Sequence, residues 1–464
     1  METDIIRDPV HNYIIVNEKE KELIDTEPVQ RLRYLKQTPS ASFVYPGANH
    51  TRFEHSLGVC HLVGEIAKSL KESGSVTDLN DWDKDVQKAR IAALLHDVGH
   101  GPFSHTFESF LEMLNIKLTH EVMTQLIIKK RLAGKIKGIF DLEDADVQDI
   151  SNMAVGKIMA VGDGGPRLYL APMVAGQIDA DKMDFLQRDA VHTGTIEYGS
   201  IDVKRLILNL RLIEINGVKI VGIKDRAAFA IESLLLSRYH MYRAVYYHRT
   251  ARSFDLMLCD AMGRAIEEID GLKWFAEGSS KIKTLIEKES DELENFLSDY
   301  LLMDDYSMMS ELNKLAKTDE RLEIMNKIRK REHYRHAYDT IFFLDSSIFR
   351  EVLDDPVKKT EREKKIKNSA EVSNMVRIDV PYEIVMLDHS QITIINDEEE
   401  PMPLDRYLSG LGGEKMSIFS NLSKFGKRFL IVNVFTDTTD KEVRKKIKEA
   451  ARLHLHDGGE TRHI

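Results

Sequence analysis

The sequence sets a histidine and an aspartate side by side, His96 and Asp97, at the end of the apolar stretch 91–95. Neighbouring side chains on an α-helix diverge by about 100°. Both can therefore reach one point in space only at the edge of a buried face, above a cleft. The apolar stretch predicts such a buried helix, and Gly99, two residues after the pair, loosens the chain.

Histidines are concentrated around this pair. Seven of the chain's 17 histidines are His50, His55, His61, His96, His100, His105 and His120. A single histidine is only intermediate in its tendency to be buried, and its ordinary roles are packing, capping or facing solvent. A metal or phosphate site needs several such side chains together. The concentration therefore predicts a site in this part of the chain.

Further ligands must come from other segments. His55 lies in TRFEHSLG, on a helix that precedes the pair. In QIDADKMDFLQRD, Asp181, Phe185 and Asp189 recur at i, i+4 and i+8, which places them on one helical face. Asp179 competes with Asp181 as a ligand, but we expect Asp179 to cap the helix.

The candidate metal ligands are two imidazoles and two carboxylates, namely His55, His96, Asp97 and Asp181. This mixed sphere suits iron, manganese, zinc or nickel better than calcium, and magnesium would prefer oxygen ligands only. A bound ion of this kind lowers the pKa of water from about 15.7 toward about 7. Such an ion suits the hydrolysis of a phosphate ester near neutral pH.

Phosphate ester hydrolysis also needs cations that balance the phosphates and an acid that protonates the leaving oxygen. The candidate cations are Arg52, Lys182 and Arg238. The candidate acids are His100, His105 and His120. Arg52 stands three residues before His55, on the same helical face.

Helical periodicity dominates the elements that must position these residues. A short hairpin is expected over 5–16, with its turn near His11 and Asn12, before two short helices over 22–37, the second starting near Pro28. Further helices are expected over 52–70, 84–98, 119–133, 175–190, 202–211 and 226–268. The stretch 277–338 is charged and helical, and the basic run 358–367 is expected to form a solvated helix or a mobile loop.

The pattern changes after about residue 374. Strands are expected within 376–387, 391–397 and 427–435, followed by an amphipathic helix over 438–455 capped by Thr439 or Asp440. The predicted fold class is mainly α, with a small N-terminal hairpin and a smaller C-terminal α+β domain. The expected domains are a core over 1–275, a charged helical extension over 276–374 and the α+β domain over 375–464.

Composition excludes several classes of protein. The net charge of −11 does not resemble a nucleic-acid coat, so nucleic acid is not a required partner. Cys60 and Cys259 are the only cysteines, which argues against a disulfide scaffold and fits a reducing compartment. No apolar stretch approaches the roughly 18 residues that span a bilayer, and the charged N-terminus has no signal-peptide core. We therefore expect a cytoplasmic protein without a membrane partner. A P-loop mechanism is unsupported, because the sequence has no glycine-rich phosphate loop.

Five motifs occur in order over residues 5–260: RDPVHNYI, DTEPVQRLRYLKQ, RFEHSLGV, LLHDVGHGPFSH and DADKMDFLQRD. Together they resemble the HD-domain phosphohydrolase superfamily. Within it they are similar to the dNTP triphosphohydrolases, the group that contains the mammalian restriction factor and bacterial dGTP-activated enzymes. The resemblance implies an HD helical core and metal-dependent hydrolysis of dNTPs to deoxynucleoside and triphosphate. It further implies dGTP as activator, a homo-oligomer (dimer or tetramer), and Mg²⁺ as a second ion beside the transition metal.

The resemblance also implies residue roles. It makes His55, His96, Asp97 and Asp181 the metal ligands. It makes His105 the proton donor to the 5′-oxygen, with His100 and His120 nearby and Glu108 in the place of an aspartate that orients this acid. The implied triphosphate contacts are Arg52, Lys182 and Arg238, and the implied contacts to the sugar 3′-hydroxyl are Gln37 and Asp189. Tyr246 matches the ring that packs against the 2′ edge of the sugar and disfavours ribonucleotides.

The motifs depart from the family at several substrate positions. Phe185 stands where the family commonly has tyrosine, and Tyr242 replaces a histidine near the substrate. Asp25, Gln30 and Arg33 match residues that read guanine at an activating site, where Asp and Gln can pair with a base edge and Arg can bind phosphate. Asp4 and Ile5 differ from the family in this region.

Two alternative functions stay open. The chain could hydrolyse another phosphoester, such as a nucleoside monophosphate, a cyclic nucleotide or a nucleic-acid end. It could also be a nucleotide-sensing regulator that uses the pocket only for binding, although all four ligands and His105 are present.

Overall fold

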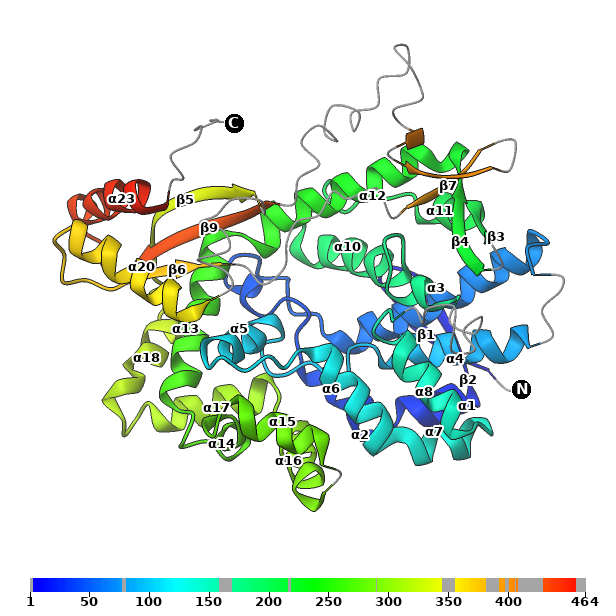
Figure 1. Cartoon of the computed structure of the whole chain (residues 1–464), viewed down its shortest axis with the longest axis horizontal. Helices are drawn as coiled ribbons and strands as arrows, with labels where there is room; N and C mark the ends of the chain where they lie inside the picture. Colours follow the sequence, from blue (N-terminus) through cyan, green and yellow to red (C-terminus); the bar gives the residue numbers. More distant parts are fainter. Residues whose placement is uncertain are drawn as a thin grey trace, which may run out of the picture.

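The computed structural model describes residues 3–76, 81–157, 169–215, 218–288, 290–343, 355–380, 392–396, 400–404, 406–407 and 429–455. Helices make up most of this structure, and the strands form small sheets at its periphery (Figure 1). The prediction of a mainly α fold is therefore confirmed. Among the described residues, we find no helix both long enough and apolar enough to cross a membrane.

The predicted N-terminal hairpin is present. Strands β1 (Thr3–Asp8) and β2 (Asn12–Asn17) pair antiparallel, and Asn12 at the turn has a left-handed φ of 63°. The Asp8 carboxylate accepts the backbone N–H groups of Val10 and His11, which fixes the turn. The following short helices are α1 (Glu18–Ile24), α2 (Glu27–Gln30) and the 3-10 turn η1 (Arg31–Tyr34).

Three helices form the centre of the molecule: α3 (Arg52–Glu72), α4 (Trp82–Leu95) and α10 (Ala180–Thr193). Helix α3 packs against both of the others. A Cβ atom at Gly58 would lie 1.9 Å from Oδ1 of Asp184, so glycine allows α3 and α10 to approach closely at this point. The neighbouring short elements are η2 (Pro39–Phe43), α5 (His105–Met113), α6 (His120–Leu126), η3 (Ile127–Leu132), α7 (Ala133–Phe140), α8 (Asp144–Met153) and α9 (Ala171–Val174).

The expected helix over 226–268 is interrupted. A 3-10 turn, η5 (Asp225–Ala227), leads into α12 (Ala228–Met241), which continues as the π-type turn η6 (Tyr242–Tyr246); α13 (Arg249–Arg264) begins after it. In the turn, the N–H of Tyr247 donates to the carbonyl oxygen of Tyr242 five residues earlier. The helix expected over 202–211 is α11 (Val203–Asn209), which ends where an unpredicted hairpin of β3 (Leu210–Ile215) and β4 (Val218–Lys224) begins.

Helices fill most of the charged stretch after α13. They are α14 (Asp270–Ala276), α15 (Ser279–Glu287), α16 (Asp291–Leu302), α17 (Asp305–Leu315), η7 (Glu320–Leu322) and α18 (Glu323–Arg329). The prediction of helix up to residue 338 is wrong at its end, because β5 (Arg335–Phe343) begins there and pairs with a strand near the C-terminus.

The C-terminal α+β part is present as predicted. Strands β5, β9 (Phe429–Thr436) and β6 (Val376–Asp379) form an antiparallel sheet in the order β5-β9-β6. Helices α20 (Pro356–Ser369) and α23 (Lys441–Leu455) pack beside it, far from the β3–β4 hairpin (Figure 1). The basic run 358–367 is therefore helical, and Ile366 is buried against this small core. Of the expected strands, residues 381–387, 391, 397 and 427–428 lie outside the described residues.

Two further short strands extend the β3–β4 hairpin. Strands β7 (Thr393–Ile395) and β8 (Pro401–Pro403) complete a sheet in the order β3-β4-β7-β8. Strand β7 confirms the strand expected within 391–397. The division of the chain into three domains stays a prediction.

Candidate active site

Three of the four candidate metal ligands come together from three different helices. His55 lies on α3, His96 follows the last residue of α4, and Asp181 lies in the first turn of α10. The Nε2 atoms of His55 and His96 are 3.2 Å apart, and Asp181 Oδ1 lies 3.0 Å from the first and 3.8 Å from the second. Ligand atoms about 2.1 Å from one tetrahedral ion would be separated by about 3.4 Å. These three side chains could therefore hold one metal ion.

Asp97 completes the cluster. Its Oδ1 lies 3.3 Å from Nε2 of His96, and its Oδ2 lies 3.8 Å from Nε2 of His55. The side chain is buried, which alone would raise its pKa, but the neighbouring Arg52 guanidinium holds the pKa well below its usual range. The structure thus brings all four predicted ligands together.

The remaining ring nitrogens show that the cluster fits a cation. His96 Nδ1 donates to the carbonyl oxygen of Ala93 at 2.7 Å, and His55 Nδ1 donates to Asp184 Oδ2 at 2.8 Å. In neutral imidazoles, both Nε2 lone pairs therefore face the same point beside two carboxylates. Burial alone would lower the pKa of His55, but hydrogen bonds with Asp181 and Asp184 raise it to about 10. The surrounding carboxylates thus favour a positive charge at this point, which a bound cation could supply in place of the His55 proton.

Asp179 does not join this cluster. Its side chain accepts the backbone N–H groups of Gly176 and Lys182, at 2.6 and 2.7 Å, at the start of α10. Asp179 therefore caps the helix and positions Asp181 two residues later, as expected.

Asp184 supports the metal cluster, and sequence reasoning missed it. It accepts hydrogen bonds from His55, from His11 in the N-terminal hairpin at 2.6 Å, and from two nitrogens of Arg188. Arg188 also donates to Asp8 at 2.8 Å. Asp184 and Arg188 are fully buried, and Arg188 holds the pKa of Asp184 well below its usual range despite burial. The N-terminal hairpin is thereby tied, through Asp184, to His55, a candidate metal ligand.

A second group surrounds the Glu108 carboxylate. Its two oxygens accept from Nδ1 of His105 and Nδ1 of His120, both at 2.7 Å. Burial lowers the pKa of an imidazole, but Glu108 raises that of His120 to about 9. Burial and the nearby charges of Arg52 and His120 lower the pKa of His100, whose ring stacks on His120. Atoms of His105, Glu108 and His120 also lie close enough together to hold an ion.

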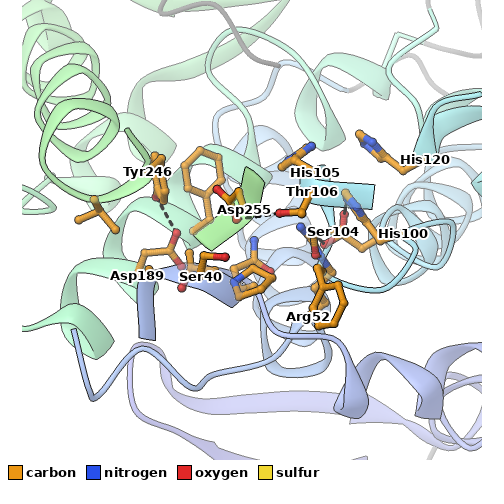
Figure 2. Close-up of a pocket in the computed structure, with 18 of the residues that line it drawn as sticks. Ser40, Arg52, His100, Ser104, His105, Thr106, His120, Asp189, Tyr246 and Asp255 are labelled. Carbon is orange, nitrogen blue, oxygen red and sulfur yellow. Dashed lines mark hydrogen bonds and ion pairs between the residues drawn. The ribbon is translucent and has the colours of Figure 1, made fainter. Parts of the chain in front are cut away.

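One cavity joins these groups. It has a volume of about 310 Å³. Figure 2 shows Tyr246 and Asp189 at one end of the pocket and His100, His105 and His120 at the other. Twelve of the predicted residues line it: Gln37, Arg52, His96, Asp97, His100, His105, His120, Asp181, Phe185, Asp189, Tyr242 and Tyr246. His55 and Glu108 are not part of this lining and reach it through the contacts described above.

Asp189 organises the end of the cavity away from the histidines. It accepts a hydrogen bond from the Tyr246 hydroxyl at 2.6 Å and contacts Nε2 of His50 at the same distance. Phe185 lies edge-on to Tyr246 and to His55. One face of α10 therefore lines the cavity with Asp181, Phe185 and Asp189, as their spacing predicted.

The three candidate phosphate cations lie differently. Arg52 lines the cavity and binds Asp97 at 2.6 Å and Ser104 Oγ at 2.8 Å. Lys182 does not line it, and its ammonium group donates to Asp179 and to the carbonyl oxygen of Gly176. Arg238 also lies outside the lining, and its buried Nε has no hydrogen-bond partner among the described residues.

The candidate activator residues lie on the corner of α1, α2 and η1. Gln30 donates to the carbonyl oxygen of Ile24 and accepts from Arg33 Nε, both at 2.9 Å. The exposed Arg33 guanidinium stacks 3.5 Å above the Phe53 ring, and Asp25 is exposed next to Ile24. The three predicted residues are therefore neighbours, outside the lining of the cavity.

The cavity wall includes a charged group that the sequence did not indicate. Asp255 on α13 accepts from Thr106 Oγ1, as Figure 2 shows, and from Arg252. Arg252 also binds Asp379 of β6 through two nitrogens. The C-terminal sheet thus contacts the wall of the cavity, a long-range contact that leaves no local pattern in the sequence.

Comparisons with known proteins agree with the motifs. The HD domain model matches residues 52–188, and the HD associated region matches residues 201–275. The deoxynucleoside triphosphate triphosphohydrolase SAMHD1 of Bos taurus is 31% identical over 360 residues, 72% of this chain and 59% of the relative. The Dictyostelium discoideum homolog of SAMHD1 is 30% identical over 346 residues, 74% of this chain and 61% of the relative.

A third relative has no described activity. It is an uncharacterized protein of Methanocaldococcus jannaschii, 38% identical over 264 residues, which are 57% of this chain and 50% of the relative. The chain thus spans between half and two thirds of the length of these three relatives. Their matches extend well beyond the HD domain itself.

Proposed function

We propose that this chain, which carries an HD domain followed by an HD-associated region, hydrolyses dNTPs to deoxynucleoside and triphosphate with a bound divalent metal. One observation carries the proposal: a single cavity holds the His/Asp cluster and the histidine–Glu108 group at one side and the Asp189–Tyr246 pair at the other. The named activity of the SAMHD1 relatives supports the same substrate class.

The metal would be held by His55, His96, Asp97 and Asp181. When bound, such an ion supplies a water of lowered pKa and positive charge beside the phosphate. The mixed nitrogen and oxygen donor set suits manganese, iron, zinc or nickel, and Mg²⁺ is proposed as a second ion. Arg52, which lines the cavity beside Asp97, would bind a phosphate oxygen. Lys182 and Arg238 would need to turn toward the cavity to join it.

His105 would protonate the leaving oxygen. Glu108 holds Nδ1 of His105 at 2.7 Å, so Nε2 is the ring nitrogen that would deliver the proton. As the bond between the α-phosphorus and the 5′-oxygen breaks, that oxygen takes the proton from His105 and leaves as a hydroxyl. The raised pKa of His120 favours its charged form, and the lowered pKa of His100 favours its neutral form. The positive charge on His120 would keep Glu108 ionised, and ionised Glu108 would keep His105 oriented.

The opposite end of the cavity would bind the deoxyribose. Asp189 and Gln37 would contact the 3′-hydroxyl, and the buried Oε1 of Gln37 has no hydrogen-bond partner among the described residues. Tyr246 is held by Asp189, so its ring would be fixed against the 2′ edge of the sugar. Phe185 and Tyr242 line the same end and would tune the choice of sugar and base.

We further propose that dGTP binds at Asp25, Gln30 and Arg33 and activates the enzyme, and that the chain works as a homo-oligomer in the cytoplasm. The contact between Gln30 and Arg33 and the exposed Arg33 guanidinium support a nucleotide site there. The activator and oligomer assignments rest on the family resemblance and on the proximity of the three residues, and the cytoplasmic location rests on the composition of the chain.

Product analysis tests the proposed reaction. Purified protein is incubated with each dNTP, alone and mixed with dGTP, in Mn²⁺ or Mg²⁺, and the products are resolved by ion exchange. Deoxynucleoside and intact triphosphate support the proposal, whereas pyrophosphate or orthophosphate places the cut at another bond. Asp181→Ala should abolish metal-dependent turnover. If the metal-loaded wild type consumes no dNTP, the proposal is wrong and another phosphoester becomes the leading substrate.

A further inference from the structure

The turn between Gly99 and α5 carries backbone strain beside the candidate acid. Phe103 and Ser104 have positive φ values of 61° and 55°, and residues other than glycine rarely adopt a positive φ. Each such residue costs on the order of 1–3 kcal/mol. The strained pair directly precedes His105, and Ser104 Oγ accepts from Arg52 at 2.8 Å. Something outside the turn must hold it in place.

Asp305 makes that contact from a distant part of the chain. It is the first residue of α17 and is 5% exposed. Its Oδ1 accepts the backbone N–H of Phe103 at 2.6 Å, and its Oδ2 accepts the N–H of Lys36 at 3.0 Å. One carboxylate therefore joins the two segments that carry His105 and Gln37.

The chain around Asp305 supports the same turn at two other points. The Tyr300 hydroxyl donates to the carbonyl oxygen of Gly99 at 2.8 Å. Arg31 donates through two nitrogens to the carbonyl oxygen of Met303 and reaches the carbonyl oxygen of Val98 at 3.5 Å. The end of α16 and the start of α17 thus stabilise the turn over residues 98–103. Asp305 contacts the strained end of this turn.

The two segments depend on Asp305 to different degrees. Lys36 pairs with Thr51, and the N–H of the following Gln37 donates to the carbonyl oxygen of His50, so that segment is held independently. The N–H of Phe103 has Asp305 as its side-chain acceptor. Losing the carboxylate would leave this buried N–H unsatisfied, which costs about 1–3 kcal/mol. The turn would keep its side-chain contacts at Ser104, whose hydroxyl accepts from Arg52 and donates to the carbonyl oxygen of Lys36 at 3.2 Å, and would lose the restraint on its backbone at Phe103.

We propose that Asp305 is a positioning residue, which holds the Phe103–Ser104 turn and thereby sets His105 and Arg52 in their reactive arrangement. The inference rests on the proposed function of His105 and Arg52. Asp305 contacts no candidate metal ligand and does not itself line the cavity, but it holds the backbone of Phe103, which does, so its effect on catalysis passes through the backbone of the turn. A displacement of about 1 Å at a reacting group can cost on the order of 100-fold in rate.

The neighbouring Asp304 provides a matched control. It caps α17 by accepting the N–H of Ser307 at 2.7 Å. Asp304→Ala should therefore destabilise the same helix by about 1 kcal/mol without removing either contact to the site. Asp305→Ala removes both.

The test compares dNTP hydrolysis, thermal unfolding, metal content and amide exchange in the two variants. Asp305→Ala should lower kcat at least tenfold with KM changed less than threefold, keep its metal, and speed exchange of the Phe103 amide at least tenfold. Asp304→Ala should keep kcat within twofold. If Asp305→Ala does not fold, Asp305→Asn is used instead, because its amide keeps one acceptor oxygen. It should also lower kcat while leaving KM nearly unchanged, with a smaller fall in kcat.

Two results would overturn the inference. One is an unchanged kcat in the folded Asp305 variant, and the other is a loss of kcat in both variants that follows their loss of stability. A wild type inactive on every dNTP would instead refute the proposed function. In that case the Phe103 amide still reports on Asp305, because unchanged exchange in the variant would show that Asp305 does not hold the turn.

Discussion

Asp184→Asn is expected to weaken metal binding without changing any metal ligand. The wild-type carboxylate accepts four hydrogen bonds, from His55, from His11 and from two nitrogens of Arg188. An asparagine amide presents one oxygen and one NH₂ group, so whichever way it turns, one pair of donors loses its acceptor. The substitution also removes the negative charge that keeps the Nδ1 proton of His55 in place.

The size of the effect follows from two contributions. Loss of the carboxylate behind a metal-binding histidine typically weakens metal binding 10- to 100-fold, about 1.4–2.7 kcal/mol. Breaking a buried ion pair on one side costs about 3–5 kcal/mol of folding free energy. Asp8 still pairs with Arg188 in the variant, so we expect a loss of stability near 3 kcal/mol, the lower end of that range.

Asp8→Asn separates these two contributions. It removes the other carboxylate that faces Arg188, 2.8 Å away, and keeps the oxygen that accepts the N–H groups of Val10 and His11. It should therefore destabilise the fold comparably while leaving the contact between His55 and Asp184 intact. Its affinity for metal should stay within about twofold of wild type.

The assay is a Mn²⁺ titration in competition with a chelator, with urea unfolding of the metal-free proteins measured in parallel. The reasoning predicts a 10- to 100-fold weaker Kd for Asp184→Asn and a near-normal Kd for Asp8→Asn. Equal affinities in wild type and Asp184→Asn would refute it. So would an equal loss of affinity in both variants, because metal binding would then follow general stability.

Three further predictions concern the pocket and the corner of α1 and α2. Tyr246→Ala should raise ribonucleotide turnover relative to dNTP turnover in competition assays, and an unchanged ratio would count against a role of this ring at the sugar. If dGTP binds near Arg33, adding it should speed hydrolysis of another dNTP and enlarge the oligomer seen by light scattering, and Arg33→Ala should lose both effects. Activity independent of dGTP in both proteins would exclude that site. The pKa of His120 is raised from 6.5 to about 9, so its pairing with Glu108 stabilises the fold fully below pH 6.5 and is lost as the pH rises through 9. The unfolding free energy of wild type should therefore exceed that of His120→Gln at pH 6 by more than at pH 10, and a constant difference would contradict the assigned pKa.

Local patterns predicted the part of the site that lies on long periodic helices. The spacing of Asp181, Phe185 and Asp189 placed all three on the cavity, because an α-helix repeats its faces every three to four residues. The capping role of Asp179 followed from its position just before the helix. Asp184 was missed, although it lies only three residues after Asp181 and helical spacing places it near the same face of α10.

Contacts between distant segments could not be predicted in this way. Asp305 reaches Phe103 across about 200 residues, and Asp379 reaches Arg252 from the C-terminal sheet. The residues next to either aspartate in the sequence do not distinguish it from an ordinary charged residue on the surface. The break at Tyr247 was missed because η6 keeps a helical hydrophobic pattern while its hydrogen bond spans five residues. The β3–β4 hairpin was also missed, although an Asn-Gly dipeptide between two apolar runs is a known hairpin signal.

The most direct test of the central claim is hydrolysis of a dNTP in water enriched in ¹⁸O, followed by mass spectrometry of the products. If water attacks the α-phosphorus and His105 protonates the departing 5′-oxygen, one ¹⁸O atom appears in the triphosphate and none in the deoxynucleoside. Label in the deoxynucleoside would place the attack on carbon. Release of pyrophosphate or orthophosphate would place the cut between phosphates, and either result would contradict the account.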